Sequence, residues 1–272
     1  MIPSAMTAGP AALIKEKMLV LTYHAVFADE KDWAAQPASD RWYSLKQDQF
    51  RVQMEHLVQN GYRTLLLREF LEGESPEKSL VLTFDDGHDS NFHVVLPILK
   101  QFGLRAEFFI TVAKVGLPGF MTWEELKLLQ EAGMSVQSHG LHHQPLTGLD
   151  LDMLRDELRT SKTLLEQYLG SPVNYFAIPG GFADERVYVE ILNAGYRAIC
   201  NSEPGLASKG RVIARVPVMH STSLATFSDL ADRKLASLRR MSAQRRLAKA
   251  AKSLLGLRRY EALKHIKLRL SK

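Results

Sequence analysis

The chain has 272 residues, of which 46% are hydrophobic and 24% charged, and its formal net charge at pH 7 is +5. This composition is ordinary for a soluble globular protein. The single cysteine, Cys200, excludes an intramolecular disulfide and fits a reducing compartment. No apolar run approaches the roughly 18 residues of a spanning helix, and no signal peptide is recognisable at the start, so we expect a cytoplasmic protein.

Predicted strands and helices alternate along residues 18–220. The predicted strands cover residues 17–24, 63–67, 80–84, 106–112, 134–137, 173–178, 196–200 and 212–218. The predicted helices cover residues 45–60, 92–102, 123–132, 150–169 and 184–193, and a polar loop covers 27–43. This alternation predicts an α/β domain of parallel strands in a closed or nearly closed barrel, with chemistry at the carboxyl ends of the strands.

The strand over residues 80–84 ends in two adjacent aspartates and a glycine, Asp85-Asp86-Gly87. Successive side chains of a strand point to opposite sides, so the two carboxylates have different surroundings. One of them can bind a metal ion while the other faces a reacting water. Asp-Gly is also a common turn dipeptide, so this segment by itself leaves a catalytic role and a turn equally open.

Two histidines four residues apart, His139 and His143, follow the strand over residues 134–137. On one helical turn both imidazoles face the same way. Two histidines and a carboxylate form a facial metal set with open positions for water, and Asp86 is the third ligand of this hypothesis. Clustered loop histidines are otherwise simply solvated, but the combination with Asp85-Asp86 favours a metal site.

Residues 83–87 and the His139-x-x-x-His143 pair resemble the first two motifs of the polysaccharide deacetylases, also called carbohydrate esterase family four or the chitooligosaccharide deacetylase homology family. Tyr23-His24, residues 176–181 and residues 215–218 are similar to further segments of that family. The resemblance implies a distorted (β/α) barrel of about seven strands over residues 18–225. An N-terminal extension (1–17) and a basic helical C-terminal extension (226–272) would flank it.

The family resemblance also implies a divalent metal ion held by Asp86, His139 and His143, with zinc first and cobalt, nickel or iron as alternatives. The expected activity is the removal of N-acetyl groups from an acetamido sugar. Asp85 would act as general base, and His220, which resembles the family's late histidine, would act as general acid. A surface histidine is the alternative for His220.

Four further residues complete the expected pocket. A backbone N–H near Gly180, next to Pro179, would stabilise the oxyanion, and His24 would line the pocket or be a buried structural histidine. Ala177 stands where many members of the family carry an arginine that orients the catalytic aspartate, and Arg215 is the candidate replacement. Gly140 stands where the family usually has Ser or Thr, so a hydroxyl that braces the loop is absent.

The end of the chain is strongly basic. Residues 233–272 hold fourteen Lys and Arg against one acid, Glu261. Apolar residues recur there at helical spacing, which predicts a basic amphipathic helix. A solvated extension, an anionic membrane surface and nucleic acid are the three possible roles, and the scarcity of aromatic residues argues against nucleic acid. Membrane docking at the inner face would bring a lipid-linked sugar within reach.

Three functions remain open from the residues alone. The first is N-deacetylation of an acetylated glycan or lipid-linked sugar. The second is hydrolysis of an O-acetyl ester or another non-peptide amide at the same metal site. The third is a non-catalytic barrel scaffold with a membrane-binding tail, although a scaffold needs none of Asp85, Asp86, His139 and His143.

Overall fold

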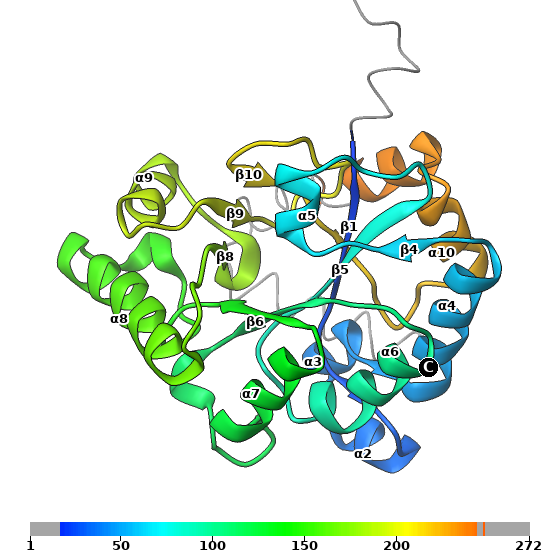
Figure 1. The fold of residues 1–272 in the computed structure, drawn as a ribbon, viewed down its shortest axis with the longest axis horizontal. Coiled ribbons are helices and arrows are strands. Elements are labelled where there is room, and N and C mark those ends of the chain that lie inside the picture. Colours follow the sequence, from blue (N-terminus) through cyan, green and yellow to red (C-terminus); the bar gives the residue numbers. More distant parts are fainter. Residues whose placement is uncertain (1–16, 244–246, 248–272) are drawn as a thin grey trace, which may run out of the picture.

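The computed structural model describes residues 17–243 and Leu247, and at its centre lies a nine-stranded sheet of these residues surrounded by helices (Figure 1). All the paired strands of this sheet run parallel. The strands are β1 (Leu19–Tyr23), β4 (Arg63–Thr64), β5 (Ser79–Phe84), β6 (Glu107–Ile110), β7 (Ser135–Ser138), β8 (Tyr175–Ala177), β9 (Ala198–Cys200), β10 (Val212–Ile213) and β11 (Val216–Pro217). The predicted α/β class is confirmed.

The sheet curls so that its two edge strands approach each other. Its strand order is β10-β9-β8-β7-β6-β5-β1-β11, with β4 paired to β5, so β10 and β11 are at opposite edges. Only Ala214 and Arg215 separate these two strands in the chain, which limits the distance between the edges to about 11 Å. The predicted barrel is therefore confirmed. The single strand predicted over residues 212–218 is wrong, because this segment is divided between the two edges.

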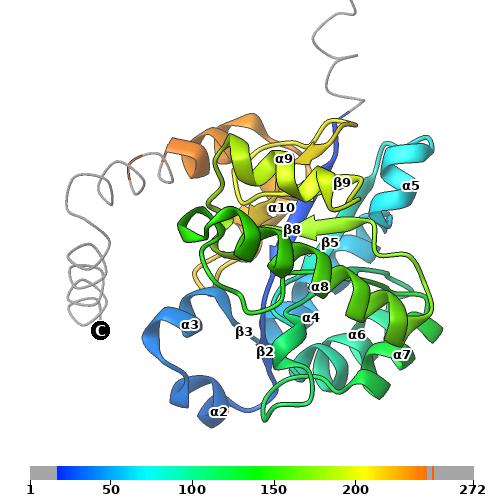
Figure 2. The ribbon, with the colours of Figure 1, turned by 90° about the vertical axis from the view of Figure 1, so that its left-hand side faces the viewer.

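Helices cover the outer face of the sheet, as Figures 1 and 2 show. They are α4 (Gln47–Gln59), α6 (Leu96–Gln101), α7 (Trp123–Glu131), α8 (Leu151–Leu169), α9 (Glu185–Asn193) and α10 (Leu224–Ala231). The short helix α5 (Leu67–Glu72) instead packs Leu67 and Phe70 against the apolar cluster inside the barrel. Thr122 begins α7 with a capping box to Glu125, as the sequence predicts. Alternate residues of β1 point to opposite faces of the sheet. Leu19 and Leu21 pack against the helices, whereas Val20 packs inside the barrel.

Two predicted segments differ from the structure. The predicted loop over residues 27–43 contains the short helices α2 (Glu30–Ala35) and α3 (Ala38–Tyr43), and β2 (Val26–Phe27) pairs with β3 (Leu45–Lys46) beside them. Neither helix has a fully buried residue, so neither leaves an apolar periodicity in the sequence. The predicted strand over 63–67 is two residues long and is followed by α5, which is too short for a periodic signal.

The chain after residue 225 continues on the barrel surface. Phe227 and Leu230 of α10 and Leu238 in the next helical segment are buried. Residues 244–246 and 248–272 of the basic tail predicted to dock to a membrane lie outside the described residues. Among the described residues, none of the helices combines the length and the apolar character that crossing a bilayer requires.

Candidate metal centre

The side chains of Asp85 and Asp86 point to different surroundings just after the carboxyl end of β5. Asp85 continues the interior face of the strand and is only 3% exposed. Asp86 leaves the strand with φ 76°, in the left-handed region that Asp tolerates better than most residues, and Gly87 follows with φ 83°. The two carboxylates therefore face different neighbours, as predicted, but the turn after β5 separates them and not the alternation of a strand.

His139 and His143 lie in an irregular loop after β7 and not on a helical turn. The helical basis of that prediction is wrong, because Gly140 (φ 83°) and His143 (φ 61°) both have left-handed backbone. The two rings nevertheless come together, with centroids 4.9 Å apart. Nδ1 of His139 lies 2.8 Å from the carbonyl oxygen of Ala177 on β8. Because a carbonyl only accepts, Nδ1 carries the proton and the lone pair of Nε2 is free for a metal.

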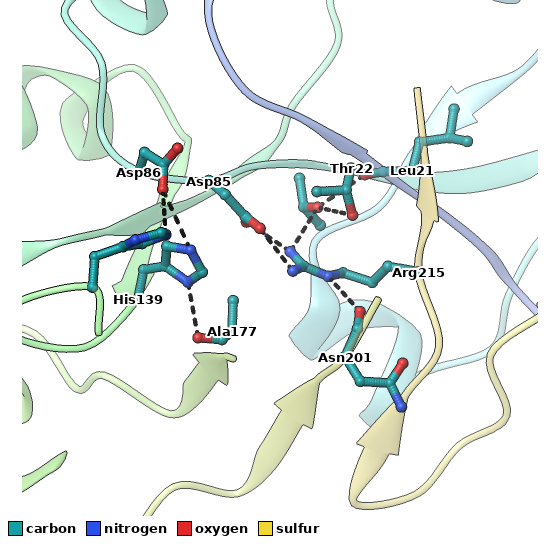
Figure 3. Close-up of polar contacts among 10 residues, drawn as sticks. Leu21, Thr22, Asp85, Asp86, His139, Ala177, Asn201 and Arg215 are labelled. Atoms are coloured by element: carbon teal, nitrogen blue, oxygen red, sulfur yellow. Dashed lines mark hydrogen bonds and ion pairs between the residues drawn. The ribbon is translucent and has the colours of Figure 1, made fainter. Parts of the chain in front are cut away.

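Asp86, His139 and His143 form one cluster in which three ligand atoms lie within 4.8 Å of one another. Oδ1 of Asp86 is 3.5 Å from Nε2 of His139 and 3.0 Å from Nε2 of His143, and Figure 3 shows its direction toward His139. This oxygen is buried and accepts no hydrogen bond of acceptable geometry from the described residues. A carboxylate and two imidazoles converging on one point fit a divalent cation.

Electrostatics keeps Asp86 in the form that a metal requires. Burial would raise its pKa, but the imidazoles of His139 and His143 outweigh burial and hold the pKa well below its usual range. Burial likewise would lower the pKa of His139, whereas the charges of Asp85 and Asp86 raise it. The cluster therefore carries an ionised carboxylate, and a divalent cation would compete with protons for the imidazole nitrogens.

Asp85 forms a buried ion pair with Arg215. The guanidinium reaches both carboxylate oxygens, with distances of 2.7 Å and 2.8 Å, and the Arg215 side chain has no exposed surface (Figure 3). Two further acceptors hold the guanidinium: the carbonyl oxygen of Asn201 at 3.0 Å and the hydroxyl of Thr83 at 3.2 Å. Burial would raise the pKa of Asp85, but Arg215 outweighs it and lowers that pKa. Arg215 thus supplies the cation that Ala177 does not.

His24 lies close enough to the cluster to respond to its charges. Burial lowers its pKa, and Asp86 and Asp85 are the next contributors, both raising it. Its Nδ1 is buried and has no hydrogen-bond partner among the described residues. Pro179 is buried and Gly180 exposed, in a short turn after β8 where Gly180 has φ 66°. The role of the Gly180 amide stays a prediction.

His220 lies in a different environment. Its ring packs on Trp33 with centroids 4.4 Å apart, and its Nδ1 is 3.1 Å from Oε1 of Gln49. Burial lowers its pKa, and the charged groups that also act on it are Lys46, Glu30 and Arg41. The structure therefore places His220 with the α2–α3 segment. No described contact joins it to Asp85 or to the metal cluster.

Several contributors were not predicted from the sequence. The carbonyl oxygens of Ala177 and Asn201 carry no signal, because every residue has one. Glu157, which holds the loop between the two histidines, does carry one. It lies on the apolar stripe of α8, whose other buried residues are Leu154, Leu158, Ser161 and Leu165. A charged residue on an apolar stripe indicates a buried polar contact.

Comparisons with known proteins point to one family. The polysaccharide deacetylase family model matches residues 72–199, a range that holds the metal cluster but ends before Arg215. YxkH of Bacillus subtilis, named as a polysaccharide deacetylase, is 28% identical over 198 residues, which are 71% of this chain and 67% of that protein. The poly-beta-1,6-N-acetyl-D-glucosamine N-deacetylase of Escherichia coli K12 is 25% identical over 70% of this chain but only 36% of its own length.

A solved structure agrees with the sequence comparisons. BC0361, a polysaccharide deacetylase from Bacillus cereus, is similar with a TM-score of 0.71 and 28% identity. The similarity covers 79% of this chain and 69% of that one. The shared part therefore includes most of the barrel described above.

Proposed function

Since the chain belongs to the polysaccharide deacetylase family, we propose that it is a metal-dependent hydrolase that removes the acetyl group from an acetamido sugar of a glycan. The convergence of Asp86, His139 and His143 beside the Asp85–Arg215 pair carries this proposal. We propose zinc as the ion, with cobalt, nickel or iron as alternatives, because imidazole and carboxylate ligands suit all of them. A bound ion would supply a Lewis acid and a water of lowered pKa.

Asp85 is the proposed general base. Its low pKa means that it is ionised at neutral pH, and Arg215 fixes its orientation through two contacts. Each carboxylate oxygen has a second lone pair, so the ion pair leaves Asp85 able to accept a proton from water. A neutral residue in place of Arg215 would leave a buried charge with no partner, which is strongly unfavourable.

We propose that either His220 or His24 donates the proton to the leaving amine. His220 is the choice from the sequence, but the structure surrounds it with Trp33 and Gln49. His24 is the second candidate: burial lowers its pKa, the nearby Asp86 and Asp85 carboxylates oppose that shift, and its Nδ1 has no hydrogen-bond partner among the described residues. His24→Asn and His220→Asn, each measured for kcat with the same substrate, distinguish the two. The donor is the histidine whose replacement lowers kcat by about 100-fold or more.

Acetate release from a panel of acetylated substrates tests the proposal. The panel contains β-1,6-linked N-acetylglucosamine oligomers, peptidoglycan fragments, a lipid-linked N-acetylated saccharide and an O-acetylated glycan, each assayed after loading with one metal at a time. We expect release from an N-acetylated member, loss on treatment with a chelator and recovery with the metal. Release only from the O-acetylated glycan would identify an esterase. No release from any member, together with no metal binding, would favour the scaffold.

A further inference from the structure

The loop that joins the two metal-binding histidines is held by a buried carboxylate that the proposed chemistry does not use. Glu157 lies in α8 and is 2% exposed. Its neighbours Leu154 and Leu158 are fully buried, so the helix gives the carboxylate a rigid base. The side chain points at residues 141–144, which have no regular secondary structure.

Glu157 binds the backbone and the side chains of this loop together. Its Oε1 accepts hydrogen bonds from the backbone N–H of Leu141 at 2.8 Å and of His142 at 2.7 Å. Its Oε2 lies 2.9 Å from Nδ1 of His142 and accepts a hydrogen bond from the side-chain Nε2 of Gln144 at 3.3 Å. One carboxylate therefore satisfies groups on residues immediately before and after His143.

The first histidine is fixed independently of Glu157. The backbone N–H of His139 donates to the carbonyl oxygen of Ile110 at 2.8 Å, and its ring is held by Ala177. His143 is in a different position, because it lies within the loop held by Glu157 and has the left-handed φ of 61° that non-glycine residues rarely adopt. Such backbone persists only where the surroundings impose it. The contacts of Glu157 are on both sides of this residue.

Gly140 allows the loop to approach the carboxylate. A Cβ at this position would lie 3.1 Å from Oε1 of Glu157, and the φ of 83° disfavours any other residue. The position has no hydroxyl to brace the loop. The carboxylate of Glu157 makes the bracing contacts here instead.

We propose that Glu157 is a positioning residue for the metal centre: it fastens residues 141–144 to α8 and so places His143 opposite Asp86 and His139. The inference rests on the metal site of the proposed function. Without the carboxylate, two backbone N–H groups lose their acceptor and the backbone of His143 is free to relax. The ion would then keep two well-placed ligands and lose the third.

The test is the zinc affinity of the full chain, measured by competition with a chromophoric chelator. Glu157→Ala should bind zinc about 10- to 100-fold more weakly than the unchanged protein. Glu157→Gln should lose less, on the order of fivefold, because its amide oxygen still accepts from the two backbone N–H groups. Glu190→Ala is the matched control: Glu190 is a mostly buried acid that also pairs with α8, through Arg155 at 2.8 Å, but among the described residues it makes no hydrogen bond or ion pair with residues 141–144.

Thermal unfolding of the metal-free proteins separates positioning from general stability. Both Glu157→Ala and Glu190→Ala should unfold at lower temperature, while only the Glu157 variants lose zinc affinity. Zinc affinity of the folded Glu157 variants within twofold of the unchanged protein would overturn the proposal, and Glu157→Gln decides if Glu157→Ala does not fold. Failure of the unchanged protein to bind zinc, cobalt, nickel or iron would overturn the metal site itself, and this inference with it.

Discussion

The interior of the barrel holds two buried acids whose surroundings differ. Asp85 follows the carboxyl end of β5 and is paired with Arg215 through both oxygens. Glu107 is the first residue of β6 and has no exposed surface; its Oε1 accepts from the backbone N–H of Leu67, and its Oε2 has no hydrogen-bond partner of acceptable geometry among the described residues. The strand before Asp85, β5, is the neighbour of β6 in the sheet.

Burial affects both carboxyls in the same direction, but their pKa values move in opposite directions. Burial raises the pKa of Glu107 to about 7, and Arg68 compensates only weakly. At Asp85 burial is outweighed by Arg215, and the pKa falls. The comparison teaches that a partner cation, and not depth alone, decides whether a buried acid in this barrel is charged at neutral pH. The charged acid lies at the metal centre, and the acid that titrates near pH 7 lies away from it.

The largest expected effect is the loss of activity on removing the charge of Asp85, the buried acid next to the candidate metal centre. Asp85→Asn should lower kcat/KM for acetate release by about 10³-fold, because a general base contributes 10²- to 10⁴-fold. Zinc binding should persist, since Asp85 is not a proposed ligand. Acetate release and zinc titration on the same preparation check this. A loss smaller than tenfold in the folded variant would contradict the role of Asp85.

Removing the guanidinium of Arg215 leaves Asp85, like Glu107, as a buried acid without a partner cation. Arg215→Met should lower the free energy of unfolding by about 3–5 kcal/mol, because it leaves a buried carboxylate without its partner. The double variant Asp85→Asn, Arg215→Met should be more stable than the sum of the single effects predicts, because neither charge remains. Urea unfolding of all four proteins completes the cycle. Additive effects would show that the pair is not coupled in the folded state.

Glu107, the buried acid without a partner cation, should make the free energy of unfolding depend on pH. The pKa of Glu107 in the folded protein, about 7, lies above the ordinary value of 4.5, so the folded state holds a proton that the unfolded state releases. The Glu107 contribution therefore lowers the free energy of unfolding as pH rises from about 4.5 to 7, by on the order of 3 kcal/mol. Glu107→Gln should remove this dependence. Urea unfolding between pH 4.5 and pH 8 measures it, and equal pH slopes for the two proteins would contradict the prediction.

Metal binding should stabilise the protein in a way that depends on the ligands of the candidate metal centre and not on Glu107. Zinc at about 100 times its dissociation constant should add about 2.7 kcal/mol to the free energy of unfolding. Glu107→Gln should gain the same amount. His143→Ala should gain much less, since one of the three ligands is gone. Thermal unfolding with and without zinc checks all three proteins, and an equal gain for His143→Ala would place the ion elsewhere.

Local sequence was enough for those parts of the site that depend on a few neighbouring residues. The apolar run before Asp85-Asp86 predicts a buried strand, and the spacing of His139 and His143 predicts a metal pair, although the loop between them is not helical. The long helix α8 was predictable because its apolar stripe repeats over five turns. The short helices α2 and α3 were not, since they bury no residue fully and leave no periodic signal.

The sequence by itself determined the class of fold, the proposed ligand set Asp86, His139 and His143, and the likeness to the deacetylases. Only the tertiary structure decided that Arg215, 130 residues away along the chain, neutralises Asp85. It also decided that the charges of Asp85 and Asp86 act on the pKa of His24 and not on that of His220. It further decided that Glu157 holds the loop that contains His143. The physical reason is that periodicity records which face of an element is buried, whereas the partner of a buried charge depends on how the sheet curls to bring its edges together.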